Sequence, residues 1–139
     1  MAPVPAVRSG AARALPWLFL TYLLAGLLHF AHNAEYLPAY PNLPAWLTRA
    51  QVYGSFAALT ALGLAGLALW RYAHGVPGLV LLAAYALLGF DGLLHYRRAP
   101  FAAHSAVMNF TILTEVAAAA VLLACVLRLL AAPARAARA

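Results

Sequence analysis

Four long apolar segments dominate the pattern of hydrophobic and polar positions along the chain, and short polar or proline-rich stretches separate them. Each segment is close to the ~20 residues that an α-helix needs to cross the hydrocarbon core of a bilayer. The pattern predicts helices over about 15–36, 48–72, 76–96 and 101–130. We therefore expect an all-α integral membrane protein: a disordered tail over 1–13, a four-transmembrane-helix bundle over 14–130, and a basic C-terminal tail over 131–139.

The residues between the apolar segments support these helix boundaries. Pro38, Pro41 and Pro44 break the chain after the first segment, and nearby aromatic residues are typical of a membrane–water interface. Thr48 is positioned as the N-cap of the second helix. Small residues at four-residue spacing in that helix predict close packing against a neighbour; they are Ala57, Ala61 and Ala65, with Gly63 and Gly66 nearby.

Composition excludes a soluble domain. Of the 139 residues, 66% are hydrophobic and only 9% are charged, whereas a soluble domain carries about 25% charged residues. The net charge of +6 comes from scattered arginines at helix ends and tails, so we expect no nucleic-acid partner. Cys125 is the only cysteine, which excludes an intrachain disulfide and a thiolate metal cage.

The arginines also predict an orientation. Four spans place both termini on one side of the membrane, and that side collects Arg8, Arg13, Arg71, Arg128, Arg135 and Arg138. The other side holds Arg49, Arg97 and Arg98. The excess favours cytoplasmic termini, and we expect a multi-pass protein of a bacterial-type inner (plasma) membrane.

Polar residues gather near one end of the predicted bundle. His29, His32 and Asn33 share a face of the first helix, and Glu35 follows them. Antiparallel topology brings this stretch to the same end as a second group from the third and fourth helices, made of Asp91, His95, His104 and Asn109. Glu115 is expected deepest in the fourth helix. Ionisable groups at such depth are expensive and mark a functional site.

Histidines with a carboxylate are a frequent ligand set for copper, iron or zinc. The predicted metal ligands are His29, His32, Asp91, His95 and His104. Asn33 and Asn109 are the candidates for orienting or holding the cofactor, and Glu35 and Glu115 for catalytic proton transfer. This set predicts a membrane metalloenzyme, an oxidoreductase or a hydrolase, that acts on a lipid-like or small apolar substrate.

Two resemblances bear on this prediction. Asp91-x3-His95-x8-His104 resembles the Asp-x3-His…His copper motif in the membrane subunit of particulate methane and ammonia monooxygenases, although the second spacing differs. The chain also resembles the EXPERA group of four-helix sterol isomerases and sigma-2 receptors. That resemblance rests on His29 with Glu35, on Phe90-Asp91-Gly92, and on Met108-Asn109. It implies metal-free proton shuttling and carbocation stabilisation, but the group has a tryptophan after Met-Asn where this chain has Phe110 to Leu113.

Other functions fit the same residues. The alternatives are a metal-free isomerase or ligand-binding protein, a subunit that holds haem between axial histidines, and a proton or ion path. Purely structural roles are also open, because single polar residues near helix ends snorkel to the interface at little cost. Membrane lipid is an expected partner, and a chain of this size is consistent with a homo-oligomer or a larger membrane complex.

Overall fold

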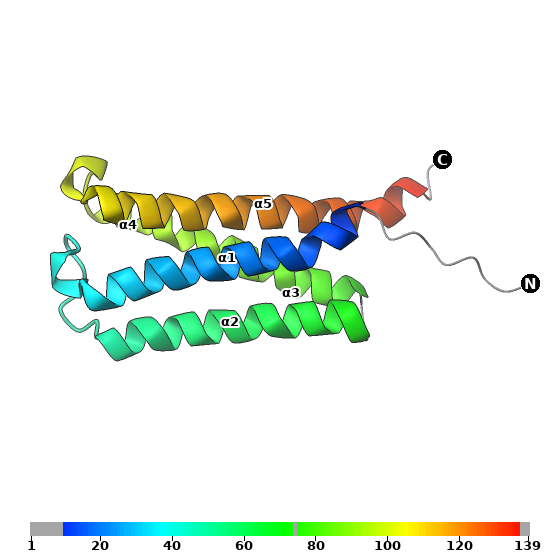
Figure 1. The fold of residues 1–139 in the computed structure, drawn as a ribbon, viewed down its shortest axis with the longest axis horizontal. Coiled ribbons are helices and arrows are strands. Elements are labelled where there is room, and N and C mark those ends of the chain that lie inside the picture. The colour runs from blue at the N-terminus through cyan, green and yellow to red at the C-terminus, as the bar shows by residue number, and fades with distance from the viewer. Residues whose placement is uncertain (1–9, 74, 137–139) are drawn as a thin grey trace, which may run out of the picture.

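The computed structural model describes residues 10–73 and 75–136, and these residues form a helical bundle without β-strands (Figure 1). The long helices are α1 (Gly10–Glu35), α2 (Arg49–Tyr72), α3 (Gly75–Leu88) and α5 (Ala106–Ala136). A 3₁₀ segment, η2 (Gly89–Leu93), joins α3 to the short helix α4 (Leu94–Arg98). The described residues contain four helical stretches long and apolar enough to cross a membrane: Gly10–Glu35, Arg49–Tyr72, Gly75–Arg98 and Ala106–Ala132.

The helices run antiparallel around a ring. α1 packs against α2 and α5, and α3 packs against the same two helices, so α1 and α3 are diagonal neighbours. The start of α1 and the end of α5 lie at one end of the bundle (Figure 1). We call the other end the polar end; it holds the connections 36–48 and 99–105, including the 3₁₀ turns η1 (Leu37–Ala39) and η3 (Phe101–Ala103). The predicted all-α arrangement of four long apolar helices is therefore confirmed for the described residues.

An apolar core occupies the half of the bundle away from the polar end. It is built from leucines, aromatic rings and small side chains, namely Leu15, Phe19, Tyr22, Leu79, Leu82, Tyr85, Ala86, Ala119, Leu122, Cys125 and Val126. Gly63 lets α2 approach α3 closely, because a Cβ there would lie 2.7 Å from ring carbons of Tyr85. The predicted close packing of the small residues is therefore confirmed for Gly63 and Gly66, whereas Ala57, Ala61 and Ala65 are exposed and do not take part in it.

Three helix boundaries differ from the predictions. α1 begins at Gly10, so residues 10–13 are helical and the prediction of a disordered tail is wrong for them; residues 1–9 lie outside the described part. α5 begins at Ala106, not at 101, because Pro100 precedes the separate turn η3. Its end extends to Ala136, so most of the predicted basic tail is helical. Alanine is frequent in both extensions, and its high helix propensity accounts for them.

The third span is not one uniform helix. η2 interrupts it near the polar end, where Gly89 and Gly92 lower the helix propensity. Gly89 lies against the Tyr22 side chain, and Tyr22 Oη donates a hydrogen bond to the Tyr85 carbonyl at 3.2 Å. The Tyr85 carbonyl is thereby satisfied beside the change of helix type. The tighter winding sets the positions of Asp91 and Gly92 at the site described below.

Candidate functional site

A buried pair of ionisable side chains joins α1 to α5. His29 Nδ1 and Glu115 Oε2 lie 2.6 Å apart, with residue exposures of 2% and 1%. Neither atom has a hydrogen-bond partner among the described residues. Because the approach does not meet hydrogen-bond geometry, we describe the pair as a charge contact. Burying these two groups without each other would be costly.

Glycines make room for this pair. A Cβ at Gly26 of α1 would lie 3.2 Å from Glu115 Oε1, and a Cβ at Gly92 of η2 would lie 3.4 Å from His29 Cε1. The pair therefore occupies space that side chains at these two positions would restrict. Neither glycine has a positive φ, so the requirement here is for space and not for backbone freedom.

A small polar cavity of about 90 Å³ lies beside the pair. Its lining comes from α1 and from the η2–α4 segment, and consists of His29, Phe30, Asn33, Asp91, Gly92 and His95. His29 belongs to both features, so its ring connects Glu115 with the cavity. Asp91 is exposed, whereas His95 is buried with 9% exposure.

One side of the cavity is closed by a contact between α1 and α4. Asn33 Nδ2 lies 3.4 Å from His95 Nε2. The His95 ring also packs near His29 and Tyr40, with ring centroids at 5.4 Å and 5.1 Å. His95 Nδ1 and Asn33 Oδ1 are buried and have no hydrogen-bond partner among the described residues. The cavity walls thus carry polar atoms available to a ligand or to water.

A second layer of rings lies toward the polar end. Tyr40 and His32 Nδ1 are hydrogen-bonded at 2.8 Å, and burial raises the pKa of Tyr40 to about 12. His104 Nδ1 lies 3.1 Å from the Pro100 carbonyl, and His104 Nε2 is buried without a partner among the described residues. The His95 and His104 rings are 6.1 Å apart between centroids. His32 and His104 therefore lie around the cavity's polar side and do not line it.

Tyr40 belongs to this region although the sequence pattern does not indicate it. With its neighbours it has the character of an interfacial aromatic residue, but it is only 3% exposed and contacts two of the histidines. Its position in a proline-rich connection gives no periodic signal of burial. The connection folds back over the bundle and carries the ring inward.

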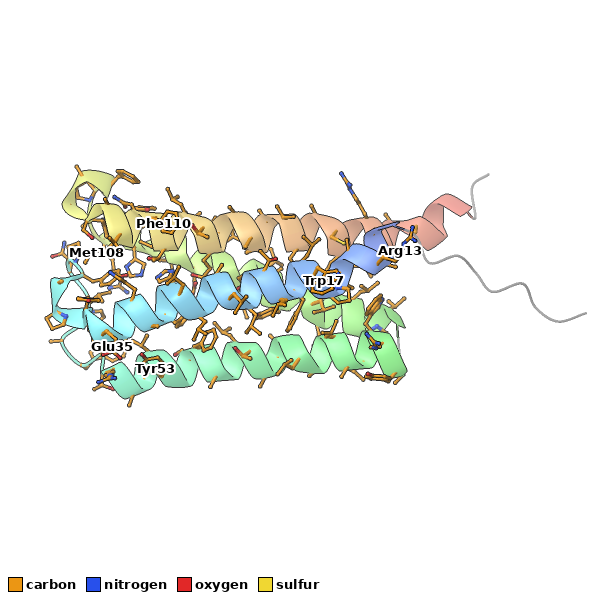
Figure 2. The ribbon with its side chains drawn as sticks, viewed as in Figure 1. Arg13, Trp17, Glu35, Tyr53, Met108 and Phe110 are labelled. Atoms are coloured by element: carbon orange, nitrogen blue, oxygen red, sulfur yellow. The ribbon has the colours of Figure 1, made fainter. Side chains whose placement is uncertain are left out.

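Glu35 lies at the surface of the polar end. Its Oε1 accepts a hydrogen bond from Tyr53 Oη at 2.7 Å and pairs with Arg49 Nη2 at 2.5 Å. Figure 2 shows Glu35 beside Tyr53, with Arg13 and Trp17 toward the other end. These contacts tie the end of α1 to the start of α2. The structure thus separates Glu35 from the buried pair, although both glutamates were candidates for proton transfer.

Asn109 is fully engaged in holding the start of α5. Its Oδ1 accepts from Tyr96 Oη at 3.0 Å, and its Nδ2 donates to the carbonyls of Phe101 and His104 at 3.2 and 3.3 Å. Of the two asparagines considered for cofactor binding, only Asn33 lines the cavity.

The capping prediction for Thr48 is confirmed, because its side chain accepts the Gln51 N–H at 3.3 Å.

Among the described residues, no group of three or more His, Cys, Asp and Glu side chains is arranged to hold a metal ion.

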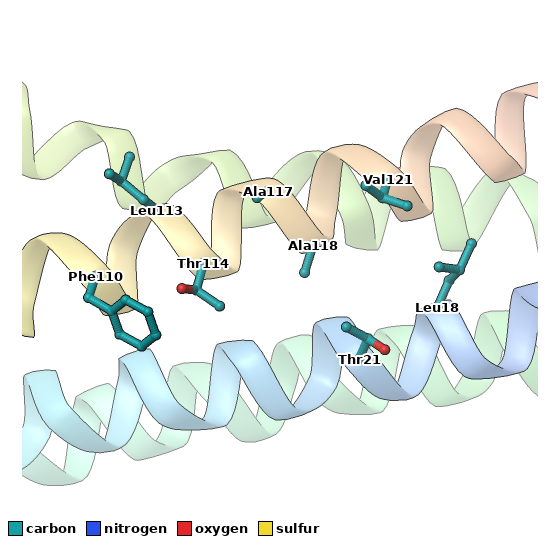
Figure 3. Close-up of a pocket in the computed structure, with 8 residues that line it drawn as sticks. All are labelled: Leu18, Thr21, Phe110, Leu113, Thr114, Ala117, Ala118 and Val121. Atoms are coloured by element: carbon teal, nitrogen blue, oxygen red, sulfur yellow. The ribbon is translucent and has the colours of Figure 1, made fainter.

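A larger groove of about 510 Å³ runs between α1 and α5, and side chains of both helices line it (Figure 3). Its lining is Leu18, Thr21, Phe110, Leu113, Thr114, Ala117, Ala118 and Val121, none of which is titratable. Of the groove and the small cavity, only the small cavity is lined by ionisable side chains.

No protein-family model, curated protein or solved structure matches this chain.

Proposed function

We propose that this chain is a multi-pass membrane protein that catalyses proton transfer on a membrane-dissolved substrate. The observation that carries the proposal is the buried His29–Glu115 pair, whose imidazole also lines a polar cavity. The excess of arginine toward the start of α1 and the end of α5 favours the cytoplasm for that end of the bundle. A bacterial-type inner membrane is the proposed location.

The pair has the parts of an oriented general base. Glu115 faces Nδ1 of His29, which leaves Nε2 as the ring nitrogen that can act on a substrate. A carboxylate in this position holds the imidazole and stabilises the imidazolium that forms when the ring accepts a proton. Asp91 and His95 on the facing wall are the groups that can return a proton.

The reaction that follows from these parts is an isomerisation. His29 removes a proton from an acidic C–H bond, the electron pair shifts within the substrate, and an acid on the opposite wall protonates a second carbon. One proton leaves and one returns, so the reaction needs no oxidant or reductant. Proximity of the base and acid, separated only by a 90 Å³ cavity, favours such an internal transfer.

Solvent deuterium tests this proposal without knowledge of the substrate. The purified protein in lipid nanodiscs is incubated with membrane lipid extract in heavy water, and the lipids are analysed by mass spectrometry after back-exchange of labile hydrogens. Wild type should place deuterium at carbon in one lipid class, and His29→Gln should not. Glu35→Gln is the matched control and should retain incorporation, because Glu35 is a surface contact. Equal incorporation by wild type and His29→Gln would contradict the assignment of His29.

A metal-dependent enzyme is the second candidate. The observation that favours it is that His29, Asp91 and His95, two imidazoles and a carboxylate, line one cavity. Their side chains are not arranged around a common point, so binding an ion would require them to move together. Copper, iron or zinc bound there would make the reaction oxidative or hydrolytic. Metal analysis of protein purified with each ion decides between the candidates: stoichiometric metal that is lost in His95→Gln supports the metalloenzyme, and an absorbance spectrum of the same sample detects haem.

A further inference from the structure

We propose that the groove between α1 and α5 binds one anionic phospholipid, with an acyl chain in the groove and the phosphate at Arg128 in a hollow that adjoins it. This site is separate from the polar cavity, and the inference shares only the membrane location with the proposed function. Three features carry it: the continuity and length of the groove, the level of the lipid–water interface, and the charge at one end.

The groove shown in Figure 3 continues toward the end of α5. A second hollow of about 380 Å³ adjoins it, and Leu18 and Val121 line both. Residues three and four apart on a helix share a face, so the lining of α5 runs along one side of that helix. The hollow is lined further by Gly10, Ala11, Ala14, Ala124, Cys125 and Arg128.

The groove is as long as one leaflet of a bilayer is thick. On α5 it extends from Phe110 to Val121, which is about 16 Å at the helical rise per residue. Half of the hydrocarbon core measures about 15 Å. The ring of Phe110 extends toward α1 at one end of the groove, and Leu18 lies toward the other (Figure 3). One acyl chain that starts at the level of Leu18 therefore matches the groove in length.

Trp17 indicates the level at which a headgroup would lie. Its side chain is 71% exposed, and the next residue is Leu18, where the groove and the hollow meet. Exposed tryptophans are enriched at the membrane–water interface. The groove then lies on the hydrocarbon side of this level and the hollow on the headgroup side. An arginine in the hollow can keep its charged end among the headgroups.

Arg128 gives the hollow a positive charge that no carboxylate side chain of the bundle neutralises. Its side chain is exposed. The whole chain has three acidic residues. Glu35 and Glu115 form the ion pairs described above, and Asp91 lines the polar cavity. The partner for this guanidinium is therefore an anion from outside the chain, and arginine binds phosphate through paired hydrogen bonds.

A second copy of the chain does not supply that anion. A copy inserted in the same orientation has its acidic residues in the buried pair or toward the polar end, and it brings further arginines to the end that holds Arg128. Anionic lipids attract arginine at the membrane surface, and they carry an apolar chain and a phosphate in one molecule. An anionic phospholipid thus satisfies the groove and the hollow together.

The test uses the full chain in phosphatidylcholine nanodiscs that contain a small share of phosphatidylglycerol with a photoreactive diazirine in the middle of one acyl chain. Illumination should attach this probe within residues 18–21 or 110–121. The same diazirine on phosphatidylcholine should label the groove about fivefold less, because an arginine near anionic headgroups contributes ~1 kcal/mol. Equal labelling by the two probes would overturn the role of the headgroup.

The distribution of the label tests the site itself. Labelling spread evenly over α2, α3 and α5 would indicate surrounding lipid only and would overturn the site. A second copy seated on this face would exclude the probe, so labelling of other helices without labelling of the groove would also overturn it.

Two matched pairs of variants separate the headgroup from the chain. Arg128→Gln should abolish the difference between the probes, whereas Arg71→Gln, at the end of α2 and outside the hollow, should keep it. Ala117→Trp should reduce labelling by both probes because its ring occupies the groove, and Ala61→Trp, at an exposed position of α2, should not. Equal effects of the two glutamine variants would overturn the assignment of Arg128, and equal effects of the two tryptophan variants would overturn that of the groove.

Discussion

Replacing Glu115 with leucine should destabilise the bundle by leaving the His29 ring buried without its partner. The two atoms lie 2.6 Å apart, both residues are almost completely buried, and neither atom has another partner among the described residues. Interhelical hydrogen bonds in a membrane average about 0.6 kcal/mol. Breaking a buried ion pair from one side costs about 3–5 kcal/mol. We expect a loss between these limits, about 2–3 kcal/mol, in Glu115→Leu.

The double variant makes this prediction specific to the pair. In His29→Leu/Glu115→Leu both members of the pair are removed, so neither is left buried without the other. The double variant should therefore be more stable than Glu115→Leu alone, with a coupling energy above ~1 kcal/mol in a double-mutant cycle. The free energy of unfolding is measured in lipid bicelles. The matched control is Glu35 with Arg49, whose side chains are 41% and 66% exposed; an exposed pair should couple by less than ~1 kcal/mol. A coupling for His29–Glu115 no larger than that of the control would refute the reasoning.

Three further outcomes follow from individual contacts. Gly26→Ala places a Cβ 3.2 Å from Glu115 Oε1 and should cost ~1–3 kcal/mol of stability and reduce deuterium incorporation, whereas Gly54→Ala, with open space around it, should gain ~0.5–1 kcal/mol. Burial raises the pKa of Tyr40 from 10.0 to about 12, so its contribution to stability is complete below pH 10 and is lost as the pH rises toward 12; unfolding measured across that range should show the loss, and Tyr40→Phe should remove it. Thr48→Ala removes the N-cap of α2 and should lower stability by ~1 kcal/mol in thermal unfolding, and an unchanged midpoint would contradict the cap.

The hydrophobic pattern is sufficient to predict the four helices and the end at which the polar residues meet. Helix period and antiparallel order alone place His29, Asp91 and His95 together, because residues one turn apart share a face. The short range of that rule also explains what it misses. It does not say how a proline-rich connection folds, so the burial of Tyr40 against His32 and His95 has no signal in the pattern.

The hydrophobic pattern also does not predict that Glu115 pairs with His29. Rise per residue places Glu115 deeper than His29, but the two side chains meet because the groups opposite them are small. Gly26 and Gly92 leave the space into which the carboxylate and the imidazole extend. Whether these side chains fit together depends on how the three helical segments are rotated relative to one another. The periodicity of a single helix gives no information about that rotation. The tighter winding of η2, with Asp91 on it, is a departure from that periodicity itself.

α2 is attached differently to its neighbours toward the two ends of the bundle. Away from the polar end, Gly63 brings it against the Tyr85 ring of α3. Toward the polar end it contacts α1 through the rings of Phe30 and Phe56, whose centroids are 5.6 Å apart, and through the exposed contact of Glu35 with Arg49 and Tyr53. Because an exposed ion pair contributes at most about 1 kcal/mol, the surface contact adds little to how firmly the start of α2 is held. Glu35 thus belongs to a surface contact between α1 and α2, apart from the buried His29–Glu115 pair.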